Sequence, residues 1–236
     1  MNKKRLTVTR QRQRSHSSII KGLYAITPDL MQTEELVDKV QEALQGGVRL
    51  LQYRNKSASC DLLREQAQVL LSLCRSYHVP MIVNDDLDLA LEIDADGVHL
   101  GQDDLARCEV KERLTGYGKI LGISCYNRLD LALQAQQLCA DYVAFGAFFP
   151  SATKPNAVEV TVGWFHQARK QIAIPIVGIG GIRLTNAAAV IQSGCAAIAV
   201  SDDLFNTRNI QLRAQQLAQL FQNVHQQDET KFSNLL

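Results

Sequence analysis

The sequence predicts a single (β/α)8 barrel. From residue 22 onward, short apolar or β-branched runs alternate with longer segments of helical periodicity, which is typical of a parallel sheet wrapped by helices. Eight such pairs in roughly 215 residues match the usual length of this barrel. Polar residues follow nearly every apolar run, at the strand ends where such barrels place their active sites.

Each run defines one element. The expected strands are Leu23–Ile26, Val48–Tyr53, Met81–Val83, Gly97–Leu100, Ile120–Ser124, Tyr142–Phe145, Ile176–Ile179 and Ala196–Val200. The expected helices cover residues 33–45, 59–76, 86–93, 104–115, 128–140, 161–171, 184–193 and 209–223.

The alternative architecture is a doubly wound open sheet. No GxGxxG motif follows the first strand, where a dinucleotide-binding sheet requires glycines beside the pyrophosphate. No linker divides the chain after residue 21. We therefore expect a basic extension at residues 1–21, one catalytic barrel at 22–225 and a C-terminal tail at 226–236.

Charge is distributed unevenly along the chain. Seven of the 25 basic residues and none of the 24 acidic residues lie in residues 1–21, so the remainder carries six more acidic than basic side chains. Such a body is a poor binder of polyanions, which argues against nucleic acid as a partner. The extension is expected to be short, disordered and undocked, because it lacks apolar periodicity.

The expected cellular location and the redox state of the cysteines are inferred from motifs that the sequence lacks. There is no apolar run of about 18 residues and no signal peptide, so neither membrane insertion nor export is expected. The six cysteines form no CxxC pair, and no HExxH motif is present, so zinc and disulfides are not indicated. We expect a cytoplasmic protein with reduced cysteines; a homo-oligomer is left open.

A cationic segment follows the second strand. Gln52, Arg54 and Lys56 recur at every second position, so an extended chain places their side chains on one face. A guanidinium and an ammonium together suit a polyphosphate. The alternative is an exposed, charged strand end. A Schiff-base role for Lys56 is disfavoured because a second cation lies two residues away.

Two carboxylates follow neighbouring strands. Asp85 follows the third strand and Asp104 the fourth, so one cation could reach both. Carboxylates beside a phosphate site suit Mg²⁺, which shares its ligands with substrate phosphates. The alternative is helix capping, because each aspartate precedes or begins an expected helix.

A second phosphate site is expected after strands seven and eight. Gly180 and Gly181 form a turn that is expected to open a helix, where backbone N–H groups can approach a phosphate. A plain turn is the alternative. Ser151, Thr153 and Lys154 lie between the two regions. The pattern indicates a Mg²⁺-dependent enzyme that joins or transfers between two phosphorylated small molecules.

At this point the chain resembles the thiamine phosphate synthase family. The resemblance covers about residues 22–205, in order and at the family's spacing. It rests on Gln52-Tyr53-Arg54-Asn55-Lys56, Asn84-Asp85 with Asp88-Leu89-Ala90, Asp96-Gly97-Val98-His99-Leu100-Gly101-Gln102, Phe149-Pro150-Ser151 with Thr153-Lys154, and Ile179-Gly180-Gly181-Ile182.

The resemblance implies a reaction and a set of site residues. A (β/α)8 barrel would join hydroxymethylpyrimidine diphosphate to thiazole phosphate, giving thiamine phosphate and pyrophosphate; the diphosphate would leave first, and the thiazole nitrogen would capture the pyrimidine methyl cation. Asp85 and Asp104 would bind Mg²⁺, with Arg54, Lys56 and Lys154 as catalytic cations. The substrate-binding set would be Gln52, Tyr53, Arg54, Asn55, Lys56, Asn84, Ser124, Ser151, Ala152, Thr153, Lys154, Gly181, Ser201 and Asp202.

Two departures from the family pattern bear on the alternatives. Tyr126 stands where many relatives have histidine, which disfavours a related thiazole tautomerase whose catalytic residue is that histidine. Ser201-Asp202 puts a carboxylate beside the expected thiazole phosphate, and we expect Asp202 to turn away and cap the following segment. A non-catalytic phosphate-binding barrel, with the basic extension carrying a partner, also stays open.

Overall fold

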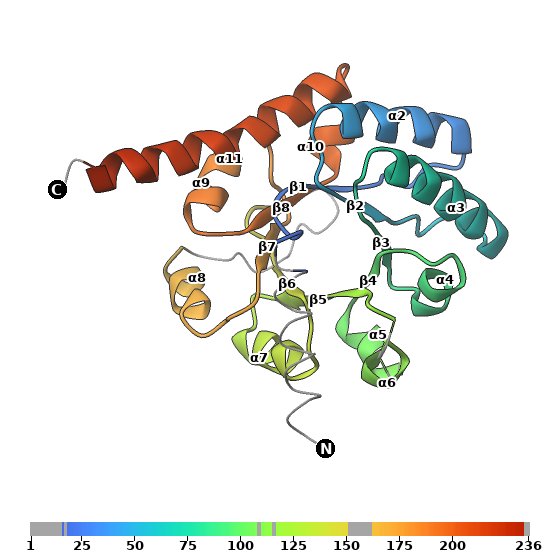
Figure 1. The fold of residues 1–236 in the computed structure, drawn as a ribbon, viewed down its shortest axis with the longest axis horizontal. Coiled ribbons are helices and arrows are strands. Elements are labelled where there is room, and N and C mark those ends of the chain that lie inside the picture. The colour runs from blue at the N-terminus through green and yellow to red at the C-terminus, as the bar shows by residue number, and fades with distance from the viewer. Residues whose placement is uncertain (1–15, 17, 108–109, 115–116, 151–161, 234–236) are drawn as a thin grey trace.

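Eight parallel strands close into a barrel surrounded by helices (Figure 1). The structure is a computed structural model that describes residues 16, 18–107, 110–114, 117–150 and 162–233. Each strand pairs with its neighbours in chain order, and β1 pairs with β8. The strands are β1 Gly22–Ile26, β2 Leu50–Tyr53, β3 Met81–Asn84, β4 Gly97–Leu100, β5 Ile120–Tyr126, β6 Tyr142–Phe145, β7 Ile176–Ile179 and β8 Ala197–Val200. The predicted (β/α)8 barrel is confirmed.

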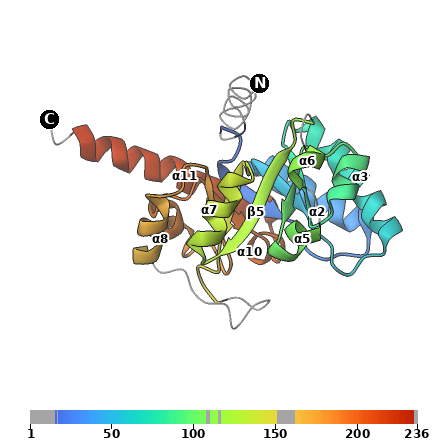
Figure 2. The same ribbon diagram turned by 90° about the horizontal axis from the view of Figure 1, so that it is seen from below.

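The helices depart from the sequence prediction in three places. They are α2 Thr33–Gln45, α3 Cys60–Ser76, α4 Leu87–Glu92, α5 Gln102–Arg107, α6 Val110–Leu114, α7 Leu129–Gln137, α8 Val162–Arg169, α9 Ala187–Gln192, α10 Asp202–Phe205 and α11 Ile210–Ser233. The single helix expected at 104–115 is two short ones, and α10 was not expected. Helix α11 continues to Ser233 and projects past the barrel, so it is longer than the helix expected at 209–223 and includes residues 226–233 (Figures 1 and 2).

Apolar side chains fill two regions on either side of the sheet. The larger lies between the strands and the helices; the smaller fills the inside of the barrel. The inner region includes Tyr24, Leu50, Ile82 and Tyr142, which come from four different strands. Along each strand, side chains that face the inside of the barrel alternate with side chains that face the helices. Among the described residues, no helix has both the length and the apolar composition needed to cross a membrane.

The packed structure begins before the first strand. Ile20 is completely buried inside the barrel, and Ile19 packs against the same cluster. His16 lies 3.0 Å from the buried carboxylate of Asp141, which also accepts a hydrogen bond from the backbone N–H of Leu121. The expectation that residues 1–21 are undocked is therefore wrong for Ile19 and Ile20, because one isoleucine inside a barrel is sufficient contact without helical periodicity.

Ile20→Ala is expected to lower the free energy of unfolding by about 2–4 kcal/mol, because it removes a fully buried side chain and leaves a cavity. Ile19→Ala is the matched control and should cost clearly less, since Ile19 is only partly buried. Urea unfolding of both variants checks this. Equal costs would show that Ile20 does not occupy the barrel interior.

Candidate active site

The segment after β2 alternates between two faces, as its spacing predicts. The Tyr53 hydroxyl donates to Gln66 on α3 at 2.9 Å, and the Asn55 amide donates to the same oxygen and to the Leu30 carbonyl. Both side chains are buried away from the strand ends. The structure therefore does not bring Tyr53 and Asn55 to the site with their side chains, whereas Gln52, Arg54 and Lys56 share the other face.

Arg54 is held by residues that follow β1. Its guanidinium contacts Asp29 at 2.8 Å, and the same carboxylate oxygen accepts from the backbone N–H of Lys56 at 3.1 Å. The Thr27 hydroxyl bonds to both the N–H and the carbonyl of Arg54 at 2.8 Å. These positioning residues were missed from the sequence. The signal was present in the polar Thr27-Pro28-Asp29 segment directly after the first strand.

Lys56, Asp85 and Asp104 meet where β2, β3 and β4 end. The Lys56 ammonium lies 3.7 Å from the Asp85 carboxylate. Burial, followed by the negative charge of Asp104, raises the pKa of Asp85, and Lys56 only partly opposes this. The structure thus places the two predicted metal ligands together beside the predicted cation.

The alternative that Asp85 and Asp104 merely cap helices is wrong for Asp85 but holds in part for Asp104. Asp86, not Asp85, caps α4 by accepting from the Leu89 N–H at 2.8 Å. Asp85 instead has a left-handed backbone, with φ of 63°, and its carboxylate lies 3.7 Å from the Lys56 ammonium. Asp104 does accept from the Gly101 N–H at 3.0 Å, so a helix-terminus contact occupies one of its oxygens.

The donor set fits Mg²⁺. The charge of Asp104 disfavours ionisation of Asp85, so a cation bound between the two carboxylates would relieve this repulsion. Mg²⁺ commonly takes only one or two protein carboxylates and completes its shell with water and substrate phosphate. Within the described part of the chain, no group of three or more acidic, histidine or cysteine side chains is placed to hold a metal ion.

Gln52 and Ser124 are linked through the barrel interior. Gln52 donates to the Tyr24 hydroxyl at 2.9 Å, and Ser124 Oγ lies 2.8 Å from Nε2 of His99. His99 is buried, and burial lowers its pKa to about 4, so the ring is neutral near pH 7. Sequence reasoning did not identify His99, Tyr24 or Tyr142 as site residues.

The loop after β7 differs from the expected helix start. Gly180 and Gly181 have φ of 93° and 64°, and a Cβ on Gly181 would lie 2.5 Å from the Phe149 carbonyl oxygen. Helix α9 begins only at Ala187, after a turn in which Asn186 donates to the Gly181 carbonyl. The prediction that this turn opens a helix directly is wrong, although the close backbone approach requires glycine.

Asp202 does not cap as expected. It is the first residue of the four-residue helix α10 and is exposed, and no side-chain cap bond forms at the Ser201 N-cap position. Its neighbour Asp203 holds the loop instead, accepting from the Leu184 N–H at 3.0 Å and pairing with Arg213 at 2.7 Å.

Asp202→Ser is therefore expected to change the free energy of unfolding by less than about 0.5 kcal/mol, as for other exposed substitutions. Asp203→Ser is the matched control and should destabilise clearly, because it leaves the Leu184 N–H and Arg213 without their carboxylate. Thermal unfolding compares the two. A larger loss in Asp202→Ser than in Asp203→Ser would contradict this assignment.

The predicted residues Ser151, Ala152, Thr153 and Lys154 lie outside the described residues. Asn84 ends β3, and its side chain hydrogen-bonds to Asp85. The rim is thus built from β2, β3, β4 and β5 on one side and from the loops after β7 and β8 on the other.

Comparisons with known proteins identify the family. Residues 23–204 match the family model described as thiamine monophosphate synthase. The chain belongs to this family. It is 50% identical to a thiamine-phosphate synthase of Nitrosospira multiformis over 202 residues, 86% of each chain. It is 51% identical to that of Methylobacillus flagellatus, covering 86% of this chain and 96% of the relative.

A solved structure shares the architecture of this thiamine monophosphate synthase family member. A thiamine phosphate pyrophosphorylase from Pyrococcus furiosus superposes with a TM-score of 0.77 at 32% identity, over 87% of this chain and 97% of the other. The tryptophan synthase alpha chain of Legionella pneumophila, at 14% identity and a TM-score of 0.68, shows the barrel fold alone.

Proposed function

We propose that this chain is a Mg²⁺-dependent thiamine phosphate synthase, which joins hydroxymethylpyrimidine diphosphate to thiazole phosphate and releases pyrophosphate. The single observation that supports this most strongly is the meeting of Lys56, Asp85 and Asp104 at the carboxyl ends of three adjacent strands. A lysine beside two neighbouring carboxylates is an arrangement suited to a metal-bound diphosphate.

The residues after β2 would act on the leaving group. When the C–O bond to the pyrimidine methylene breaks, its electron pair goes to the departing diphosphate, where negative charge accumulates. Lys56 and Arg54 would stabilise that charge, and Asp29 would keep the Arg54 guanidinium oriented. Asp85 and Asp104 would hold the metal, which supplies further charge neutralisation when bound.

The second substrate would be received across the rim. Backbone N–H groups of Gly181 and the Ser201 loop would bind its phosphate, with Ser151, Thr153 and Lys154 approaching from the loop between the two regions. Its ring nitrogen would then add to the pyrimidine methylene and form the C–N bond. Such a reaction depends on leaving-group stabilisation and positioning, and needs no side-chain base.

The direct test is incubation with both phosphorylated substrates, with and without Mg²⁺. The expected products are thiamine phosphate and pyrophosphate in equal amounts, formed only with the metal. Conversion of a thiazole phosphate alone, without metal, would favour the tautomerase alternative. Binding of both substrates without turnover would favour the non-catalytic barrel.

We also propose a cytoplasmic location. Cys74, Cys125 and Cys195 are buried without disulfide partners, and Cys60 and Cys139 are free as well, among the cysteines that the structure describes. Free thiols in these numbers fit a reducing compartment.

A further inference from the structure

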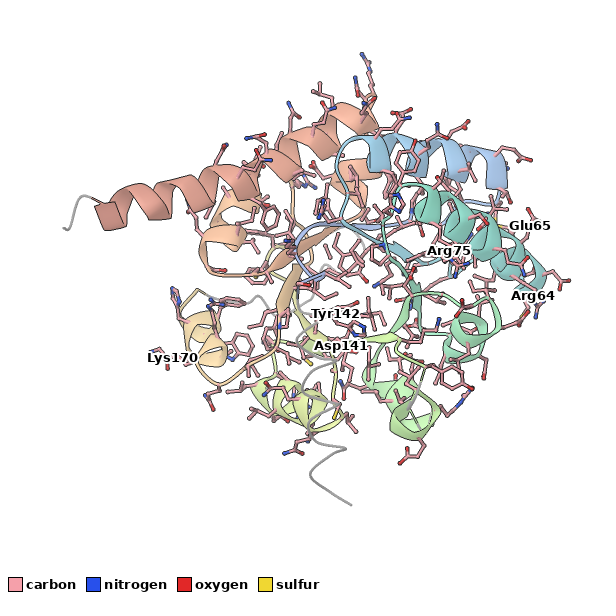
Figure 3. The ribbon with its side chains drawn as sticks, in the orientation of Figure 1. Arg64, Glu65, Arg75, Asp141, Tyr142 and Lys170 are labelled. Atoms are coloured by element: carbon pink, nitrogen blue, oxygen red, sulfur yellow. The ribbon has the colours of Figure 1, made fainter. Side chains whose placement is uncertain are left out.

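Five side chains form one continuous hydrogen-bonded chain through the barrel. They come from five strands and run in the order Gln52, Tyr24, Tyr142, His99, Ser124. The linking distances are 2.9 Å from Gln52 Nε2 to Tyr24 Oη, 2.8 Å between the tyrosine hydroxyls, 2.9 Å from Tyr142 Oη to His99 Nδ1 and 2.8 Å from His99 Nε2 to Ser124 Oγ. Figure 3 shows Tyr142 near the centre of the ring of helices.

A glycine on β5 leaves space for these hydrogen-bonded side chains. A Cβ at Gly122 on β5 would lie 2.1 Å from Cζ of Tyr142, so only glycine allows the tyrosine ring to sit across the strand. The Tyr142 ring stacks on His99, with centroids 5.5 Å apart, and meets the Tyr24 ring edge-on at 6.0 Å. Gln52, Tyr24, Tyr142 and His99 are all buried, which leaves little space for water to substitute for a missing partner.

The chemistry of the groups sets one direction for the whole chain. The Gln52 amide nitrogen can only donate, so the Tyr24 oxygen accepts from it. Tyr24 has a single hydrogen, which must then go to Tyr142. The single hydrogen of Tyr142 goes to Nδ1 of His99 in turn.

The remaining bond follows from the charge on His99. A buried imidazole between two hydroxyls is neutral and carries one N–H. With Nδ1 accepting, that hydrogen is on Nε2 and is donated to Ser124. The hydroxyl hydrogen of Ser124 is left to donate to a further acceptor, and the Gln52 carbonyl oxygen is left to accept.

The donor-to-acceptor direction of these hydrogen bonds can reverse only if all of them reverse together. If the residue 52 side chain accepts from Tyr24 instead, each hydroxyl must donate the other way, His99 must carry its hydrogen on Nδ1, and Ser124 must donate to Nε2. Mixed states leave at least one buried hydrogen without an acceptor, which costs about 1–3 kcal/mol.

We propose that Tyr24, Tyr142 and His99 are positioning residues that couple the hydrogen-bonding role of Ser124 to that of Gln52. Resting on the proposed function, this coupling selects a nitrogen heteroaromatic ring that offers an acceptor to Ser124 and a donor to Gln52. An aminopyrimidine carries both, as a ring nitrogen and an exocyclic amino group. The tautomer of His99 thus shows whether the residue 52 side chain donates to Tyr24 or accepts from it.

The test is ¹⁵N NMR of the histidine rings, which distinguishes the two neutral tautomers without any substrate. In the wild type, His99 is expected as the Nε2–H form. In Gln52→Glu at pH 9, where an ionised carboxylate can only accept, it is expected to switch to Nδ1–H. Adding Tyr142→Phe to Gln52→Glu should abolish the dependence on residue 52, because phenylalanine cannot relay the hydrogen bond.

If Gln52→Glu does not fold, a second variant, Ser124→Ala, tests the same coupling. In Ser124→Ala, His99 should keep Nε2–H even though its acceptor is gone, because, with the Gln52 amide nitrogen donating to Tyr24, a switch would leave the Tyr24 hydrogen without an acceptor inside the barrel. Tyr53→Phe is the matched control, since it removes a buried tyrosine hydroxyl bonded to a glutamine outside the chain, and it should leave the tautomer unchanged.

Three results would overturn the proposal: an Nδ1–H form in the wild type, no switch in Gln52→Glu, or a switch that survives Tyr142→Phe. In the synthase assay, Tyr142→Phe should lower kcat/KM for the pyrimidine diphosphate about tenfold, as for loss of a buried hydrogen bond, and leave KM for the thiazole phosphate unchanged. A wild type without synthase activity would overturn the proposed function while the NMR results stood independently.

Discussion

Asp85→Asn combined with Asp104→Asn is expected to reduce Mg²⁺-dependent formation of thiamine phosphate by at least about a thousandfold, because it removes both metal carboxylates. The barrel should remain folded, since the Asp85 side chain is 38% exposed and Asp104 is only partly buried. Steady-state turnover and circular dichroism of the double variant check both statements. Undiminished turnover would refute the metal assignment.

Asp85→Asn alone should also make the metal-free protein more stable. The native pKa of Asp85 is raised, so the folded state holds its proton more tightly than the unfolded state, and stability falls as pH rises above the ordinary value. At pH 7 the variant should therefore have the higher free energy of unfolding, and this gain should vanish below about pH 4.

Asp94→Asn is the matched control for that variant. Asp94 has the same left-handed backbone, with φ of 60°, but its pKa is lowered by hydrogen bonding to Lys119 and then by the charge of that lysine. Its replacement should therefore reduce stability at pH 7 and leave turnover unchanged. Loss of stability in both variants would contradict the proposed repulsion between Asp85 and Asp104.

Lys56→Met is expected to lower kcat by roughly 10²–10³-fold, because a cation beside the leaving diphosphate matters most as negative charge develops there. KM for the thiazole phosphate should change little, since that substrate binds across the rim. Single-turnover kinetics separate the two effects.

The control is Lys39→Met on α2. Lys39 also pairs with a carboxylate, Glu35 at 3.6 Å, but both residues lie on one helix and neither is among the predicted site residues. It should leave kcat unchanged. Equal losses of binding for both substrates in Lys56→Met would indicate a general structural role instead.

Strand positions could be predicted closely because each apolar run is bounded by polar or turn residues. Tyr142–Phe145 and Ile176–Ile179 match the expected bounds, while β5 extends two residues further, to Tyr126, through a register shift beside Ser124. Period-two alternation likewise identified Gln52, Arg54 and Lys56 as one face. These features depend on local sequence, which is why a single chain suffices to predict them.

The features that the sequence did not predict depend on contacts between segments far apart in the chain. Asp29, which follows β1, contacts Arg54, which follows the neighbouring strand β2, and the His99–Tyr142 bond joins residues 43 positions apart. Ile20 is buried because the barrel closes around it, although its neighbours in the sequence are polar or charged on both sides of the Ile19-Ile20 pair. Short helices such as α10 carry too few residues for a periodic signal.

The central claim is that Asp85, Asp104 and Lys56 form one site for a metal-bound diphosphate. Electron paramagnetic resonance of Mn²⁺, used as a Mg²⁺ substitute, measures free and bound metal directly in the presence of pyrophosphate. The wild type should retain bound Mn²⁺ only with pyrophosphate present, Lys56→Met should retain less, and Asp85→Asn with Asp104→Asn should retain none at the same concentrations. Mn²⁺ binding that is unchanged in the double variant would contradict the account.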